Sequence, residues 1–258
     1  MAGLSLFPMR DYLLVFLTLC CTAFSTNAQT IIPEWFEKMP DPPTGTMYAV
    51  GYAGRYQNPI LARKAALYQA LTNMSKQVQA HLIFEIEDLA DGIFRLLNPT
   101  FDLSYEAPAL LEIESNYSAL DSAISSEGYF ILISYPPTKH KISANDKEWS
   151  ARPDWTFNLP SSKEYYYGVG IVSNYSSWVR AWKDTDEYAR FDLGKNIEIA
   201  ARSTHTIQRD NRNVIESKII RQSYEQTLMK SVIISRWYDQ NSDTYYSLCR
   251  QPRSAKPD

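Results

Sequence analysis

A repeat of about 120 residues is the feature that most constrains the fold of this chain. Tyr48-Ala49-Val50-Gly51 returns 119 positions later as Tyr167-Gly168-Val169-Gly170, and the match continues without a gap through the run that follows. Aligned pairs under this offset include Tyr56 with Tyr175, Ala62 with Ala181, Ala70 with Ala189 and Lys76 with Lys195. A unit of this length is a usual size for a folding domain. The sequence therefore predicts two tandem copies of one small fold.

The composition is that of a folded protein. The 258 residues are 45% apolar and 13% aromatic, with 18 tyrosines, so each copy can bury a core. The net charge of -3 comes with no long basic run that would neutralise phosphates. No nucleic-acid partner is expected.

Residues 1–28 have the pattern of a secretory signal peptide. Arg10 precedes an apolar stretch over 12–23, and Ser25-Thr26-Asn27-Ala28 carries small residues where signal peptidase cleaves. The apolar stretch is shorter than the roughly 20 residues that span a bilayer, and no later stretch is longer. We therefore expect an exported protein with no transmembrane span in the mature chain.

Lipidation of the exported chain is not expected. A lipid-acceptor cysteine normally follows Gly, Ala or Ser, whereas Cys20 follows Leu19 and Cys21 follows Cys20. Removal of the signal leaves Cys249, which then has no partner for an internal disulfide. The fold must be held by its core.

The repeated motif begins with a strand and a helix. Residues 47–53 favour a strand in which Gly51 marks a place where the backbone approaches closely or bends, and Asn58-Pro59 is a helix-start signal for the run to Ala80. Apolar residues recur in this run at spacings of three, four and seven, so one helix face can pack on a sheet. In the second copy the matching apolar stripe runs from Val179 to Ala200 and is interrupted by Asp186.

The segments after the helices differ between the copies. Residues 81–87 alternate and predict a strand, and 89–97 predict a short helix. In the second copy 203–208 predict a weaker strand, followed by a longer run over 215–230 in which Ile220, Tyr224 and Leu228 share one helical face. Polar turns between apolar runs then predict a closing hairpin in each copy. The hairpins cover 116–133 and 232–249.

These patterns predict an α+β protein with two tandem repeats. Each repeat is expected to be a small, mostly antiparallel sheet packed against an amphipathic helix. The predicted boundaries are a signal peptide at 1–28, a first domain at 29–135, a linker at 136–152, a second domain at 153–250 and a loose tail at 251–258.

With these motifs in place, the chain resembles the bacterial LPP-twenty lipoprotein family, whose domain also occurs in the flagellar assembly protein T. The resemblance rests on Pro33-Glu34-Trp35 or Pro153-Asp154-Trp155, then Tyr-x-Val-Gly, then an alanine-containing helix and a closing strand pair. It covers both copies and implies a small α+β domain in an envelope protein without known catalytic activity. The chain departs from the family in lacking a suitable lipid-acceptor cysteine.

The sequence shows no constellation that indicates catalysis. His81, His140 and His205 are isolated, without the spacing of a zinc site, so neither a metal nor a cofactor is expected. Glu85, Glu87, Asp88 and Asp91 form an acidic group that could hold a calcium ion or act as paired carboxylates. Glu85 and Glu87 alternate with apolar residues, which favours a solvated strand face. The expectation is a protein that is not an enzyme.

The aromatic residues of the second copy form one candidate binding set. Tyr166, Tyr175 and Trp178 lie around the repeated motif, where exposed rings would stack on sugar rings or on a partner protein. The first hypothesis is therefore a periplasmic or outer-membrane-associated protein that acts through contacts with envelope proteins. The alternative is a carbohydrate or peptidoglycan binder that uses these three aromatics.

Overall fold

The computed structural model describes residues 31–88, 94–95, 101–206 and 220–253, apart from residues 57, 106, 126, 141, 143 and 144. The predicted signal peptide lies outside this described part. The described residues belong to one compact unit. Helices and small antiparallel sheets are both present, which confirms the α+β class.

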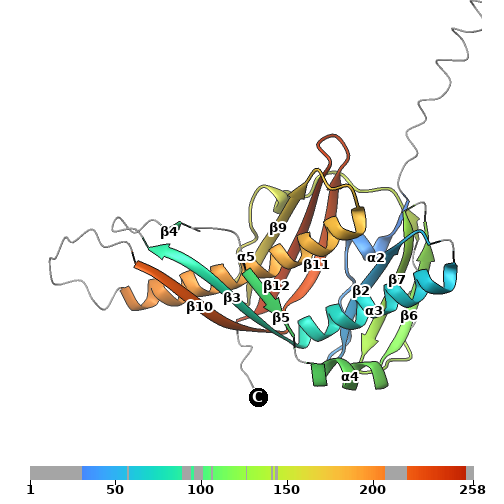
Figure 1. Ribbon diagram of the computed structural model, residues 1–258, viewed down its shortest axis with the longest axis horizontal. Coiled ribbons are helices and arrows are strands. Elements are labelled where there is room, and N and C mark those ends of the chain that lie inside the picture. The colour runs from blue at the N-terminus through green and yellow to red at the C-terminus, as the bar shows by residue number, and fades with distance from the viewer. Residues whose placement is uncertain are drawn as a thin grey trace, which may run out of the picture. The chain divides into compact units, whose positions relative to one another are not determined.

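The first copy is a three-stranded antiparallel sheet with a helix on one face (Figure 1). The sheet order is β2-β7-β6, and α3 packs against β2 and β7. Its elements are β1 (Ile32–Pro33), α2 (Glu34–Glu37), β2 (Met47–Gly54), α3 (Pro59–Val78), β3 (Gln79–Asp88), β4 (Phe94–Arg95), β5 (Phe101–Ser104), α4 (Ala107–Ser115), β6 (Ser118–Ile124) and β7 (Gly128–Tyr135). The predicted strand, helix and hairpin are confirmed.

The second copy repeats this arrangement with the sheet order β11-β12-β9, packed against α5. Its elements are η1 (Asp154–Thr156), β9 (Tyr165–Ser173), α5 (Trp178–Thr206), β10 (Ile220–Met229), β11 (Val232–Asp239) and β12 (Thr244–Pro252). Between the copies, β8 (Asp146–Lys147) pairs with β1, so the predicted linker includes a short strand.

The repeated glycine is fixed by the contact between strand and helix. A Cβ atom on Gly51 would lie 1.9 Å from the carbonyl oxygen of Ala66, and one on Gly170 would lie 1.9 Å from that of Thr185. These positions are related by the same 119-residue offset. Only a residue without a side chain allows the backbones to come this close. The close approach predicted at Gly51 is confirmed in both copies.

A second contact between helix and strand also follows the repeat. The side-chain amide of Asn73 donates to the Val50 carbonyl at 2.8 Å, and the Val169 amide donates to the carboxylate of Asp192 at 3.0 Å. Asn73 and Asp192 are aligned in the repeat, as are Val50 and Val169. In both copies the bond reaches the edge strand of the sheet, where backbone groups would otherwise lack a partner.

The start of α3 is capped as the sequence predicts. The side chain of Asn58 accepts a hydrogen bond from the Ile60 amide at 2.9 Å, and Pro59 occupies the first turn, where its missing N–H costs no bond.

The copies diverge after their helices. Helix α3 ends at Val78 and the chain turns into β3, whereas α5 continues to Thr206. The weak strand predicted from residue 203 is therefore wrong over 203–206, because the helix continues there. Residues 207 and 208 lie outside the described part.

The helical face predicted over 215–230 is also wrong where the structure describes it. Ile220–Met229 forms β10, which pairs antiparallel with β3 over ten residue pairs, from Ile220 with Asp88 to Met229 with Gln79. Residues spaced by four share a face in a strand as well as in a helix, since four is a multiple of the strand period of two. Residues 220–229 form a strand because their backbone groups pair with β3, which lies far away in the sequence.

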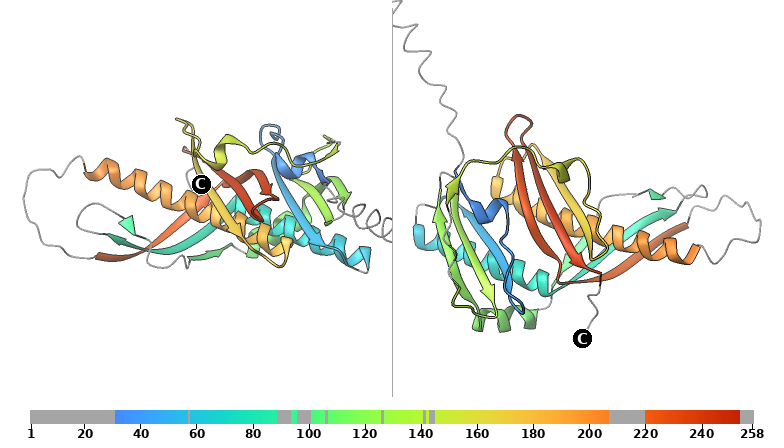
Figure 2. Two further views of the ribbon diagram at one scale, coloured as in Figure 1. Left: turned by 90° about the horizontal axis from the view of Figure 1, so that it is seen from above. Right: turned by 180° about the vertical axis from the view of Figure 1, so that it is seen from behind.

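The short helix predicted at 89–97 is not seen at its described positions. Phe94 and Arg95 form β4 and pair with β3, and the other residues of the segment lie outside the described part. Strand β5 also pairs with β3. Helix α5 runs along this additional sheet (Figure 2). Phe191 on α5 stacks on Phe101 at 4.7 Å and lies edge-on to Phe84 at 5.6 Å.

We expect Gly51→Ala to destabilise the protein by about 2 kcal/mol or more, because the new methyl group would force β2 away from the α3 backbone. Gly54→Ala in the same strand is the control. Its Cβ would lie 3.7 Å from Val179, an ordinary contact, so its cost should stay within about 0.5 kcal/mol. Urea unfolding measures both values. Equal costs would contradict this account of the glycine.

Candidate functional site

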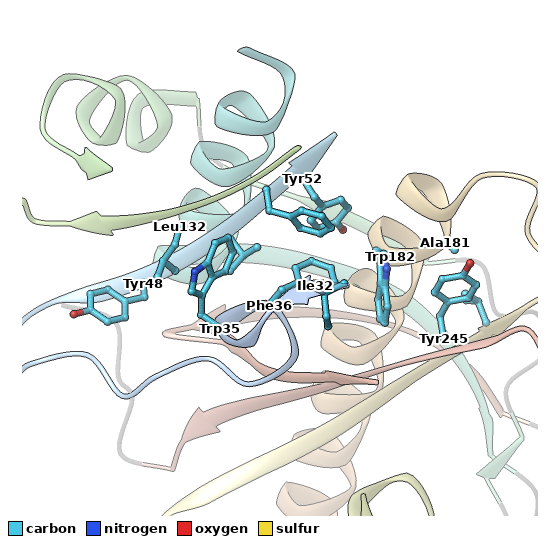
Figure 3. Packing of buried hydrophobic residues seen from close by; sticks show 12 residues of the cluster. Ile32, Trp35, Phe36, Tyr48, Tyr52, Leu132, Ala181, Trp182 and Tyr245 are labelled. Carbon is cyan, nitrogen blue, oxygen red and sulfur yellow. The ribbon is translucent and has the colours of Figure 1, made fainter. Parts of the chain in front are cut away.

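The two copies meet in an aromatic core. Phe36 from α2 makes edge contacts with Phe130 at 4.8 Å, Trp182 at 5.4 Å and Tyr52 at 5.6 Å. The ring therefore lies between the sheet of the first copy and helix α5 of the second, as Figure 3 shows for Phe36, Tyr52 and Trp182. Edge-on aromatic contacts of this kind add about 0.5–1.5 kcal/mol each beyond the area they bury.

A buried ion pair lies beside this core. Arg236 on β11 donates through Nε and Nη2 to the two carboxylate oxygens of Asp186 on α5, at 3.1 and 2.8 Å. Both side chains are 3% exposed. Ser247 on β12 donates a further hydrogen bond to Asp186 at 2.7 Å. The carboxylate thus has fixed donors from two strands, which offsets the cost of removing it from water.

The ion pair also reaches the first copy. The Tyr52 hydroxyl donates to Asp186 at 3.5 Å, and Nη1 of Arg236 donates to the Phe36 carbonyl at 3.4 Å. The guanidinium lies 4.9 Å from the centre of the Phe36 ring. Burial and the negative charge of Asp186 raise the pKa of Tyr52 well above its usual value. Tyr52 is therefore a neutral hydrogen-bond donor.

The charges stand at positions that are uncharged in the first copy. Asp186 aligns with Leu67, and Arg236 and Ser247 pair across β11 and β12 as Ser122 and Ile131 pair across β6 and β7. The polar cluster is therefore a property of the second copy alone. The interruption of the apolar stripe at Asp186 was the sequence signal for it. Arg236 and Ser247 were missed, because strand partners cannot be read from spacing along the chain.

A second, partly buried ion pair joins the helices of the two copies. Lys76 on α3 contacts Glu187 on α5 at 2.5 Å, with the lysine side chain 6% exposed. Burial lowers the pKa of Lys76 and the charge of Glu187 opposes this shift. Because Lys76 lies at the end of α3, the pair fixes the position where the chain enters β3.

These charges do not line a ligand site. The void beside Arg236, Arg190 and Tyr48 measures about 10 Å³, which is at most the space of one water molecule. Within the described part of the chain, no three His, Cys, Asp or Glu side chains are placed to share a metal ion. What the arrangement can do chemically is hold two copies together.

The predicted binding aromatics do not form one cluster. Trp178 stacks on Phe130 at 5.5 Å within the core between the copies, and Tyr175 borders the same core. The Tyr175 hydroxyl donates to Asp184 at 2.8 Å, and burial followed by this bond raises its pKa to about 12. Tyr166 packs in a separate cluster around Ala189 and Leu193.

The other predicted candidates are placed as follows. Glu85 and Glu87 fall on β3, but their side chains lie outside the described part, as does that of His205. The ring of His81 lies 3.2 Å from the Gln79 amide nitrogen and 3.4 Å from the Thr227 hydroxyl, and His140 is exposed.

One open cleft lies at the Pro-Glu-Trp motif of the first copy. Its volume is about 380 Å³, within the usual range for small-ligand sites. The lining residues mix charged and apolar side chains: Glu34, Trp35, Lys38, Met39, Pro40, Asp41 and Ile142. Asp41 is already paired with Arg250 at 3.1 Å. The cleft therefore offers contacts but no group of convergent catalytic side chains.

Exposed apolar side chains mark a different surface. Tyr56, just before α3, and Ile60 and Leu61, in its first turn, are each at least half exposed. Ile171 and Phe157 are similarly exposed in the second copy. Apolar groups gathered in this way on a surface indicate a contact site for another protein or a membrane.

Comparison of the chain with protein-family models, curated proteins and solved structures gave no match. Among the described helices, none is both long and apolar enough to cross a membrane.

We expect Asp186→Ala to lower the free energy of unfolding by about 3–5 kcal/mol, because it leaves Arg236 buried without a counter-charge. The double variant Asp186→Leu with Arg236→Met should be distinctly more stable than Asp186→Ala, since it removes both charges and restores the leucine of the first copy. Urea unfolding of both variants measures the difference. A cost below about 1 kcal/mol for Asp186→Ala would contradict a central role for the pair.

Cys249 provides a reporter for the same region. The thiol is buried beneath α5, and burial raises its pKa to about 12. Only the thiolate reacts readily with thiol reagents. At pH 8 we therefore expect the native protein to resist labelling at Cys249, as read by peptide mass spectrometry. Labelling should accelerate in Asp186→Ala, and rapid labelling of the native protein would show that the region opens freely.

Proposed function

We propose that this chain is an exported, non-enzymatic cell-envelope protein that acts through protein–protein contacts. The signal-like segment 1–28 supports export, and the resemblance to the LPP-twenty family supports a periplasmic or outer-membrane-associated location.

The proposal rests on one observation: the charged side chains in the interior are paired with each other, while apolar side chains are exposed on the surface. The buried pair of Asp186 and Arg236 lies inside the second copy, and the pair of buried Lys76 with partly exposed Glu187 joins the two copies. Tyr56 and Ile60 are exposed at or just before the start of α3, whereas their counterparts Tyr175 and Val179 pack against the core between the copies. Leu61 aligns with the exposed Arg180. A surface of this type gains free energy by covering itself with another protein.

Glycan binding through Tyr166, Tyr175 and Trp178 receives less support. A sugar-binding platform needs rings that are free to stack on a flat sugar face. Trp178 already stacks on Phe130, and the hydroxyl of Tyr175 is engaged by Asp184.

A photo-crosslinking residue placed at Ile60 tests the proposal in cells of the native host. We expect protein adducts from position 60 and few from position 111, because Leu111 is equally exposed but lies on α4, away from the apolar group. Mass spectrometry identifies the adducts. Equal yields at both positions, or binding of cell-wall fragments that Tyr175→Phe abolishes, would count against protein contacts as the function.

A further inference from the structure

The packing of the second copy on the first uses two different surfaces. We call the start of α5 and the adjoining end of β11, with Tyr175, Val179 and Tyr238, the donor surface. All three side chains pack against the core between the copies. We call the sheet face of the first copy that is turned away from α3 the acceptor surface. It is formed by Val50, Tyr52, Phe130 and Leu132, which are each at most 1% exposed.

The second copy has its own acceptor surface. Tyr52 pairs with Phe130 across β2 and β7, and Ile171 pairs with Tyr246 at the aligned position of β9 and β12. Ile171 is 52% exposed, whereas Tyr52 is 1% exposed. Phe157, which is 66% exposed, borders the same face, since Arg152 lies 3.8 Å from its ring centre and 5.3 Å from that of Tyr246. Tyr246 and Leu248, the counterparts of Phe130 and Leu132, are 8% and 4% exposed, so the open part of this acceptor surface is the side around Ile171 and Phe157.

The first copy correspondingly has an uncovered donor surface. Tyr56 aligns with Tyr175, Ile60 with Val179 and, through the strand pairing, Ile124 with Tyr238. These first-copy residues are 50%, 65% and 74% exposed. The described part of the chain thus exposes apolar side chains on two surfaces, the donor surface of the first copy and the acceptor surface of the second. They correspond to the two surfaces that are joined inside it.

The entry segments show the same relation. Lys38 bridges to Ser235 on β11, and the Met39 amide donates to the Ile234 carbonyl at 3.0 Å. Met39 lies four residues after the tryptophan of Pro-Glu-Trp. Leu159 lies four residues after the tryptophan of Pro-Asp-Trp in the second copy, and it is 44% exposed. Strand β6, the counterpart of β11, is an edge strand of its sheet. Leu159 of one chain is therefore placed to reach β6 of another.

We propose that chains associate head to tail, with the donor surface of the first copy in one chain packed on the acceptor surface of the second copy in the next. The inference rests on the proposed function through protein contacts and names the partner as a second copy of this chain. The template is the contact between the copies. A contact between two different surfaces is heterologous, so it extends to a ring or a filament.

The contact between chains is weaker than the one inside the chain. Trp182, at the centre of the internal contact, aligns with Arg63 in the first copy. An exposed arginine contributes less apolar area than a buried tryptophan, and its charge must lose water on association. Association is therefore reversible and depends on protein concentration.

Three single variants test the proposal by sedimentation velocity over a range of concentrations, with the protein purified as its host processes it. Ile60→Asp removes the donor surface and Ile171→Asp removes the acceptor surface. Leu111→Asp is the matched control. We expect the natural chain and Leu111→Asp to associate as concentration rises, and each of the other two to weaken association by about 30-fold or more.

Mixing the two defective variants distinguishes this geometry from any symmetric contact. Ile60→Asp keeps its acceptor surface and Ile171→Asp keeps its donor surface, so the mixture should form a one-to-one pair that does not grow further. A symmetric contact would not be restored in this way. Failure of the mixture to pair overturns the proposal, as does a natural chain that remains monomeric at every concentration.

An engineered disulfide tests independently whether the donor surface of one chain contacts the acceptor surface of another. A Cβ on Gly54 would lie 3.7 Å from Val179, and the aligned pair between chains is Ser173 with Ile60. We expect oxidation to link Ile60→Cys with Ser173→Cys, and not Leu111→Cys with Ser173→Cys. If the natural chain is monomeric but position 60 crosslinks to another envelope protein in cells, self-association fails and the proposed function stands. If position 60 captures no protein at all, both fail.

Discussion

The ion pair between Asp186 and Arg236 is the interaction on which the joining of the two copies depends. It lies inside the second copy, between α5 and its sheet, but Tyr52 and the Phe36 carbonyl of the first copy complete its set of hydrogen bonds. Removing one partner of a buried ion pair is strongly destabilising, because it leaves the other charge buried without compensation. Any movement of the first copy away from α5 would therefore remove bonds from the pair as well as apolar contacts.

The two copies share one fold and a few aligned contacts, although most aligned residues differ between them. Two contacts keep helix and sheet together in both copies. One is the close backbone approach at Gly51 and Gly170, and the other is the hydrogen bond that involves Asn73 in the first copy and Asp192 in the second. Where the first copy has Leu67 the second has Asp186, so one helix face is apolar and the other carries the pair. The strands β3 and β10 then join the copies in one sheet.

The exposed apolar residues result from the way in which the two copies contact each other, because each copy has only one of its two apolar surfaces covered. In this chain each copy has apolar side chains at the start of its helix and on the sheet face turned away from that helix. Inside the chain one of each is covered by the other, as Trp178 on Phe130 shows. The remaining pair, around Ile60 and Ile171, stays on the surface. The internal contact therefore uses one surface of each kind and leaves Ile60 and Ile171 exposed.

The sequence by itself determined the elements whose signals are local. The strand with Gly51, the helix that starts at Asn58 and the closing hairpins depend on caps, turns and periods that neighbouring residues carry. The repeat likewise determined that two copies of one fold are present. Asp186 was visible as an interruption of an apolar stripe, so half of the central ion pair was already marked.

Only the tertiary structure decided which partners these elements meet. Ile220, Tyr224 and Leu228 share a face in a helix and in a strand, and pairing with β3 selected the strand. Arg236 could not be assigned to Asp186, because strand order and register depend on contacts between residues 50 positions apart. Nor could Trp178 be placed in the core before the sheet of the first copy was there to cover it. Local chemistry sets the elements, and long-range packing sets the surfaces on which function depends.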